Sequence, residues 1–128
     1  MFFQFSHQEP THYLHDPEFH GQFGQATEVA KLFKNKKNGF FIEAGAYDGE
    51  VYSNSLLFEK KLNWTGLLVE PNPDNFKSLL SKNRKCYSIE TCLSTKSHVI
   101  EVSFDAAGKK NTARAIIKAA DAPLYLGE

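Results

Sequence analysis

Helices and strands are predicted to alternate along most of the chain. Apolar residues recur at i, i+3 and i+4 within 26–33 and again after Pro73, a spacing typical of a helix that buries one face. Two short runs contain only apolar residues, which is typical of strands that helices cover on both faces. The predicted helices span 26–33, 53–62 and 73–82, and the predicted strands span 40–42, 67–69, 86–93 and 99–104. This order predicts an α/β domain with a mainly parallel sheet and helices on both faces.

The two ends of the chain lack this periodicity. Residues 1–25 contain four of the five His residues and two prolines, and they predict an irregular arm. Residues 105–111 predict a loop, and the helix-compatible segment 112–122 contains only two large apolar residues. We therefore expect an irregular arm at 1–25, a folded unit at 26–104 and an atypical tail at 105–128.

Composition excludes several classes of protein. The chain has 128 residues, enough for one domain, and its 15 basic and 15 acidic residues leave no net charge at pH 7. A neutral chain has no general attraction for nucleic acid, so we expect no nucleic-acid partner. No apolar run approaches the roughly 20 residues of a membrane helix, so we expect no membrane span. Cys86 and Cys92 fall about 20 Å apart in one predicted strand, which excludes a disulfide between them, and we expect no metal site.

A glycine turn and two glutamates are predicted to lie at one edge of the sheet. Glu43 and Glu70 each end a predicted strand, and open parallel sheets bind ligands at the carboxyl ends of their strands. The turn between them, 45–49, begins and ends with glycine, which lets a backbone approach a ligand closely. Glu70 follows this turn by about 20 residues, the spacing at which an acidic residue binds the hydroxyls of a ribose. Taken singly, each feature is more typical of plain packing; their order and spacing together favour a nucleoside site.

The charge around the turn indicates which nucleoside to expect. The spacing of the glycines is not that of a dinucleotide-binding motif, and Glu43, Asp48 and Glu50 would repel a diphosphate. Acidic side chains instead favour a ligand that carries an ammonium or sulfonium group. S-adenosylmethionine carries both of these groups and a ribose, so we expect it as the cofactor.

Other polar and aromatic residues are predicted to have structural roles. Lys82, Arg84 and Lys85 lie at the end of a predicted helix, where solvent and the helix dipole account for them. Trp64 is predicted to pack against the preceding helix. Cys92 has no adjacent base in the sequence, which argues against a nucleophile.

Five segments, taken in order, carry a resemblance to a known family: Phe40–Glu50, Ser53–Leu56, Trp64–Pro73, Lys82–Lys85 and Cys92–Ser94. They resemble the FkbM-type methyltransferase domain, and within it most closely the animal branch related to the protein Star. The resemblance extends over roughly residues 19–104, and 26–104 is interpreted as the N-terminal half of that domain. It implies a class I, Rossmann-like methyltransferase fold that uses S-adenosylmethionine to methylate small molecules or sugars. The cofactor site that it implies consists of Glu43, Gly45, Ala46, Tyr47, Asp48, Gly49, Glu70 and Cys92.

The resemblance leaves three interpretations open. The family's later acidic motif, Asp-x-Glu-Gly, has no counterpart before Glu128, so we expect either a truncated domain or one in which an alternative end replaces the second half. The first interpretation is a methyltransferase-like protein with a small-molecule acceptor and no assigned catalytic residue. The second is a Star-like, non-catalytic protein that binds secretory cargo in vesicle-mediated transport; its location is then the endoplasmic reticulum and Golgi rather than the cytoplasm. The third is a fragment without function.

Overall fold

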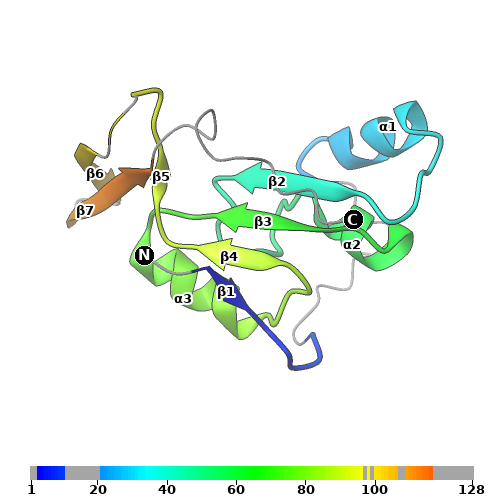
Figure 1. Ribbon diagram of the computed structural model, residues 1–128, viewed down its shortest axis with the longest axis horizontal. Helices are drawn as coiled ribbons and strands as arrows, with labels where there is room; N and C mark the ends of the chain where they lie inside the picture. The colour runs from blue at the N-terminus through cyan, green and yellow to red at the C-terminus, as the bar shows by residue number, and fades with distance from the viewer. Residues whose placement is uncertain (1–2, 11–20, 97, 99, 107–108, 117–128) are drawn as a thin grey trace.

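The computed structural model describes residues 3–10, 21–96, 98, 100–106 and 109–116. These residues form a four-stranded sheet, a three-stranded sheet and three helices (Figure 1). Within them, no helix is both long enough and apolar enough to cross a membrane.

Parallel pairing brings the carboxyl ends of three strands to one edge of the larger sheet. Its strands are β1 at Gln4–Phe5, β2 at Phe40–Ala44, β3 at Thr65–Val69 and β4 at Tyr87–Ile89. They lie in the order β1-β4-β3-β2. β2, β3 and β4 are mutually parallel, so their arrows point the same way in Figure 1, whereas β1 is antiparallel to β4. The predicted strands at 40–42 and 67–69 are therefore confirmed, together with their parallel arrangement.

The three predicted helices are present with small changes of boundary. α1 spans Gln25–Leu32, α2 spans Leu56–Leu62 and α3 spans Pro73–Ser81. At the start of α3, the Asn72 side chain accepts hydrogen bonds from the main-chain N–H groups of Asp74 and Asn75, at 2.9 and 3.4 Å. Pro73 occupies the first helical position, where its missing N–H costs nothing. Local capping chemistry thus accounts for where α3 begins.

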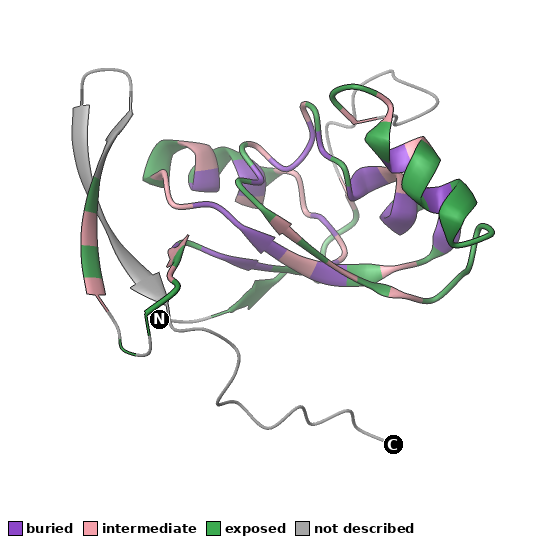
Figure 2. Ribbon diagram, turned by 90° about the horizontal axis from the view of Figure 1, so that it is seen from above, coloured by how far each residue is buried: buried purple, intermediate pink, exposed green. Residues whose placement is uncertain are grey.

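All three helices lie on one face of the larger sheet, which corrects the prediction of helices on both faces (Figure 2). Phe41 packs on this face against two hydrophobic clusters, one formed with α1 and α2 and the other with α3. On the opposite face, Phe40 and Ile42 are 57% and 65% exposed. The strand order explains the result. β2, β3 and β4 are neighbours in chain order, so two right-handed crossovers in the same direction place α2 and α3 on the same side.

The strand predicted at 86–93 is divided between the two sheets. β4 ends, and after a two-residue break β5 at Cys92–Leu93 pairs with the smaller sheet. The main chain of Glu70 continues the parallel pairing of β3 and β4 by one more step: its N–H donates to the Ile89 oxygen at 3.1 Å, and its oxygen accepts from the Thr91 N–H at 3.3 Å. Beyond this point Cys92 and Leu93 pair with β7 of the other sheet, so the single predicted strand is wrong.

The smaller sheet has the strand order β5-β7-β6. Its long strands are β6 at Ile100–Ala106 and β7 at Lys109–Ile116. The edge strand predicted at 99–104 is confirmed as β6. The loop predicted at 105–111 and the helix predicted at 112–122 are wrong where β7 forms, and residues from 117 on lie outside the described part. Every residue of β6 is paired with one of β7, so antiparallel backbone bonding outweighs the good helix propensity of this segment.

Part of the predicted irregular arm forms a strand. β1 pairs antiparallel with β4, with Gln4 opposite Ser88 and Phe5 opposite Tyr87. The rings of Phe5 and Tyr87 have their centroids 5.1 Å apart. The irregular arm is therefore a wrong prediction at β1, because the open edge of β4 offers backbone groups that a short strand can satisfy. Residues 11–20 of the arm lie outside the described residues.

Candidate functional site

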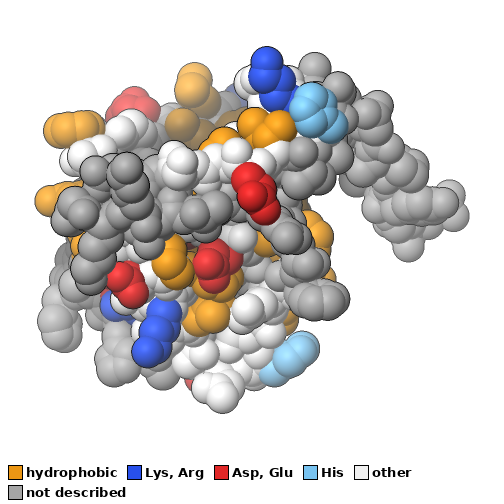
Figure 3. Space-filling model, turned by 90° about the vertical axis from the view of Figure 1, so that its left-hand side faces the viewer, with side chains coloured by type: hydrophobic (Ala, Val, Ile, Leu, Met, Phe, Trp, Pro, Cys, Tyr) orange, Lys and Arg blue, Asp and Glu red, His pale blue; other side chains and the backbone are white. Residues whose placement is uncertain are grey.

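Glu43 and Glu70 lie at the same edge of the larger sheet. In the parallel register of β2 and β3, Ala44 is opposite Val69, and each glutamate is one residue away from that pair. The Gly45 and Ala46 N–H groups both donate to the Val69 oxygen, at 2.9 and 3.1 Å, which fixes the start of the glycine turn against the end of β3. Figure 3 views this edge, where acidic side chains stand among hydrophobic ones.

The carboxylate of Glu70 connects the glycine turn to the start of α3. Its side chain is nearly buried, with only 5% of the residue exposed. Oε2 accepts a hydrogen bond from the Tyr47 N–H at 2.8 Å, and Oε1 accepts one from the Asn72 N–H at 2.8 Å. A carboxylate has about four lone-pair sites, so each oxygen can accept a further donor from a ligand.

The two glycines of the turn have different roles. Gly45, Tyr47 and Gly49 all have positive φ angles, of 76°, 53° and 77°. A Cβ added to Gly45 would meet no atom within 4 Å, so the backbone there faces open space. A Cβ added to Gly49 would lie 3.1 Å from the Leu79 side chain, so this glycine permits close packing against α3. Of the two, Gly45 is the one that a ligand can approach.

The remaining residues of the predicted turn are divided between its interior and its surface. Ala46 is buried in the cluster with Leu68, and the Tyr47 side chain is half exposed. Asp48 accepts hydrogen bonds from the Glu50 and Val51 N–H groups at 2.9 and 2.8 Å, so it shapes the turn that leads towards α2. The Asp48 carboxylate therefore has a structural role, because main-chain N–H groups already donate to it.

Glu43 holds the segment that precedes α2. Its carboxylate accepts hydrogen bonds from the Ser53 hydroxyl at 2.9 Å, from the Asn54 N–H at 2.7 Å and from the Ser55 hydroxyl. It also lines a cavity of about 340 Å³ between α1 and β2, whose other walls are mostly hydrophobic. Glu43 is thus turned towards α1 and α2, whereas Glu70 is turned towards the glycine turn.

Arg84 is a central residue of this region that the sequence analysis placed in solvent. Its guanidinium is almost fully buried and donates to Glu59 Oε2 at 2.8 Å. It also donates to the main-chain oxygen of Gly49 and to the hydroxyls of Ser53 and Ser55, the latter two at 3.3 and 3.1 Å. Arg84 therefore joins the end of the glycine turn to the two serines that hold Glu43. The sequence signal was a glutamate on the buried face of α2, which requires a cation inside the fold.

Comparison with known families identifies the chain. The model of the methyltransferase FkbM domain matches residues 43–123, which is more than half of the chain. The chain belongs to the methyltransferase FkbM domain family. No curated protein and no solved structure matches it. The matched FkbM region begins at Glu43, contains every residue of the predicted cofactor site and continues past residue 104, where the sequence resemblance ended. The family model does not distinguish the Star-related branch, which stays a prediction.

The ion pairs of the FkbM domain leave negative charge at the carboxyl edge. Lys82 lies 2.6 Å from Glu50 and 3.8 Å from Asp48, so it is not simply solvated as predicted. Within the described residues, neither Glu43 nor Glu70 forms an ion pair. These two carboxylates are therefore available for a cationic ligand to neutralise.

Cys92 lies close to Glu70 but is not an activated thiol. Both cysteines are free, Cys86 buried and Cys92 partly exposed. Burial, and to a lesser extent the negative charge of Glu70, raises the pKa of the Cys92 thiol. A raised pKa keeps the thiol protonated at neutral pH, which argues against a nucleophilic role. Among the described residues there is also no cluster of three side chains that could hold a metal ion.

Proposed function

We propose that this FkbM domain binds S-adenosylmethionine at the carboxyl edge of β2, β3 and β4. The observation that carries the proposal is the Glu70 carboxylate, nearly buried, without an ion pair and next to the glycine turn. An acidic side chain at the end of the second strand of such a sheet suits the two hydroxyls of a ribose. The open side of Gly45 supports close approach of the methionine part to the backbone.

The charges support a cationic cofactor. The ammonium group of the cofactor would lie near Glu43, and its overall positive charge would compensate Glu43 and Glu70, which no side-chain cation neutralises in the described residues. A diphosphate would instead be repelled by these two carboxylates. When bound, the cofactor would supply the methyl group. The residues of this chain would bind and orient it, with Cys92 beside the adenosine part.

The acceptor that we propose is a small molecule. The cavity beside Glu43 has a volume of about 340 Å³, within the range of small-ligand pockets, and its walls are largely hydrophobic. Among the described residues, Glu43 Oε1 accepts one hydrogen bond, from Asn54, and it can accept another from a hydroxyl or amine. This favours an acceptor with an apolar body and one such group. No residue is assigned as a catalytic base.

Calorimetry with S-adenosylmethionine and S-adenosylhomocysteine tests the proposal. We expect heat of binding for the folded wild-type protein and weaker binding by about 1–3 kcal/mol for Glu70→Ala, because the ribose loses its hydrogen bonds. Glu28→Ala is the control, since Glu28 is an exposed glutamate of α1 that pairs with the exposed Lys31. A folded wild-type protein that binds neither compound would refute the proposal.

A second candidate is the Star-like function, a non-catalytic domain that binds secretory cargo. The observation in its favour is that Glu43 and Glu70 are hydrogen-bonded by the protein itself, so the carboxyl edge is held without a cofactor. Localisation of a tagged chain in cells separates the candidates. Residence in the endoplasmic reticulum or Golgi without cofactor binding favours the second, and free diffusion in the cytosol counts against it.

A further inference from the structure

We propose that Ser53 and Ser55, which Arg84 holds in place, position Glu43 to recognise the ammonium group of the cofactor. Hydrogen bonds connect all four side chains. The role of the serines rests on the function proposed above and concerns how the site selects one part of its ligand. Neither serine needs to touch the ligand, so both are positioning residues.

The two carboxylate oxygens of Glu43 are bonded differently. Oε2 accepts hydrogen bonds from two hydroxyls, that of Ser53 at 2.9 Å and that of Ser55. Oε1 accepts one from the Asn54 N–H at 2.7 Å, and this bond lies nearer the surface. Donors on both oxygens fix the plane of the carboxylate, yet a carboxylate has about four lone-pair sites and can take a further donor. The Glu43 side chain therefore meets a ligand in one defined orientation.

Arg84 determines which way the two hydroxyls point. Its guanidinium donates to the oxygens of Ser53 and Ser55, at 3.3 and 3.1 Å. A hydroxyl that accepts from a guanidinium turns its own hydrogen away from it, because Arg has donors only. Both hydroxyls donate instead to Glu43 Oε2. Each serine is thus a bridge between a cation and a carboxylate, and such charge-assisted bonds are stronger than neutral ones.

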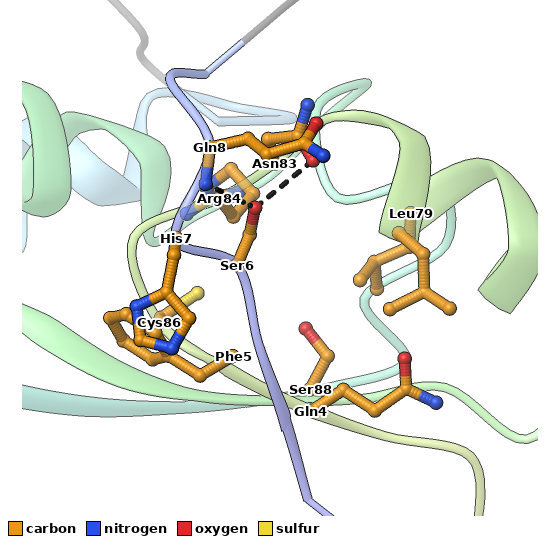
Figure 4. A pocket seen from close by; sticks show the side chains of 11 residues that line it. Gln4, Phe5, Ser6, His7, Gln8, Leu79, Asn83, Arg84, Cys86 and Ser88 are labelled. Atoms are coloured by element: carbon orange, nitrogen blue, oxygen red, sulfur yellow. Dashed lines mark hydrogen bonds between the residues drawn. The ribbon is translucent and has the colours of Figure 1, made fainter.

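Contacts away from the carboxyl edge hold the guanidinium. Glu59 Oε2 accepts from Arg84 Nε at 2.8 Å, and Glu59 Oε1 accepts from the Lys85 N–H at 3.0 Å. On the preceding side, the hydroxyl of Ser6, next to β1, donates to Asn83 Oδ1 at 3.0 Å (Figure 4). The chain is anchored immediately before and after Arg84, so the serines are oriented before a ligand arrives.

The charges of this group leave one negative charge for a ligand. Arg84 and Glu59 form a buried ion pair and offset each other. Glu43 receives two hydroxyls and an N–H group, which stabilise its charge without cancelling it. An ammonium group would cancel it, whereas the same ligand without its amino group would leave it in place. The site therefore discriminates by charge, and the discrimination depends on how firmly the serines hold the carboxylate.

Calorimetry with two ligands tests the role of the serines. One is S-adenosylhomocysteine, and the other is its analogue with hydrogen in place of the amino group. We expect the wild type to bind the first about tenfold more tightly, and Glu43→Gln to bind both about equally. Ser55→Ala should reduce the ratio to about threefold or less, because Glu43 loses one hydroxyl bond and the carboxylate is freer to turn. Ser78→Ala, at an exposed serine of α3, should keep the wild-type ratio.

Ser55→Cys is a second variant in case the alanine protein does not fold. Cysteine is close to serine in size but its thiol is a weak donor, so the ratio should also fall. Thermal unfolding shows whether each variant is folded before it is titrated. A purely structural role for Ser55 would weaken both ligands by the same factor and leave the ratio unchanged.

Three results would overturn the proposal. A wild-type ratio near one would show that the ammonium group is not recognised, while cofactor binding itself stands. An unchanged ratio in the folded Ser55 variants would show that this serine does not act through Glu43. Binding of neither ligand by the folded wild type would refute the proposed function, and the role of the serines with it.

Discussion

The Tyr47 N–H donates a hydrogen bond of 2.8 Å to the carboxylate of Glu70. The tyrosine occupies the left-handed region with φ of 53°, which costs backbone energy for a residue other than glycine. The bond to a nearly buried charge offsets this cost. The same carboxylate also accepts from the Asn72 N–H, so one side chain sets both the glycine turn and the start of α3.

Replacing Glu70 with glutamine should destabilise the fold. Glutamine keeps one acceptor oxygen and presents an NH₂ group to the other main-chain N–H, so we expect a loss of about 1–3 kcal/mol in the free energy of unfolding. Urea denaturation measures the loss, and hydrogen exchange at Tyr47 should quicken. Glu28→Gln on the exposed face of α1 should leave both unchanged. Equal stability of Glu70→Gln and the wild type would contradict the role given to this carboxylate.

Arg84→Met should be more damaging than a comparable surface change. It leaves the Glu59 carboxylate buried without its partner, and breaking a buried ion pair in this way costs about 3–5 kcal/mol. Denaturant titration should show the loss. Adding Glu59→Gln should restore part of it, because the uncompensated charge is removed.

The exposed pair of Lys31 and Glu28 provides the comparison for Arg84. Lys31→Met should cost less than about 1 kcal/mol, because solvent screens this pair. Similar losses for Arg84→Met and Lys31→Met would show that Arg84 does not hold the turn and the serines together.

The glycines at the two ends of the turn should respond differently to alanine. Gly45→Ala forces a side chain into a left-handed conformation but meets no neighbour, so we expect a cost of about 1–2 kcal/mol. Gly49→Ala has the same strain and adds a contact 3.1 Å from Leu79, so its loss should be larger. Thermal unfolding measures which variant loses more stability. Among variants that still fold, Gly45→Ala should weaken cofactor binding more than Gly49→Ala, because of these two glycines only Gly45 offers an open backbone to a ligand.

The two thiols should differ in their reaction with iodoacetamide. Cys86 should react only when the protein unfolds, because it is buried and burial raises its pKa. Cys92 should react in the native state, but its raised pKa means that less thiolate is present at a given pH than in a free thiol. The reaction of Cys92 with iodoacetamide should therefore become fast at a higher pH than the reaction of glutathione does.

Removing the charge of Glu70 tests why the pKa of Cys92 is raised. Glu70→Gln should lower the Cys92 pKa towards its usual value and increase the rate of its reaction with iodoacetamide at pH 8. The increase should be less than about tenfold, because burial is the larger cause. An unchanged rate would place Glu70 too far from the thiol to act on it.

Local patterns predicted the central elements of the fold. The apolar runs at 40–42 and 67–69 became parallel strands, and the Asn-Pro pair at 72–73 predicted the start of α3. These features depend on neighbouring residues and on burial, which the sequence displays directly. The same patterns predicted that Glu43 and Glu70 would share an edge, because parallel strands align their carboxyl ends.

Long-range relationships were missed. Arg84 was placed in solvent because nothing beside it in the chain shows that it contacts Gly49 and Glu59, which are 35 and 25 residues away. The division of 86–93 depends on the pairing of Cys92 and Leu93 with β7, a strand that lies more than 15 residues further along the chain and that the sequence did not predict. Helices were wrongly predicted on both faces of the larger sheet. Apolar strands such as β2 are typical of sheets that helices cover on both faces, whereas the crossovers here place all three helices on one face.

The uncovered side of the larger sheet affects how this protein should be assayed. Ile42, Leu67, Tyr87 and Phe5 lie in one row across the four strands, and three of them are at least 38% exposed. Such a row binds the dye ANS, whose fluorescence is ordinarily used to recognise molten globules. Bright dye emission from a natively folded sample is therefore expected. Side-chain NMR dispersion or near-UV circular dichroism should be used instead to judge whether a variant has kept its tertiary packing.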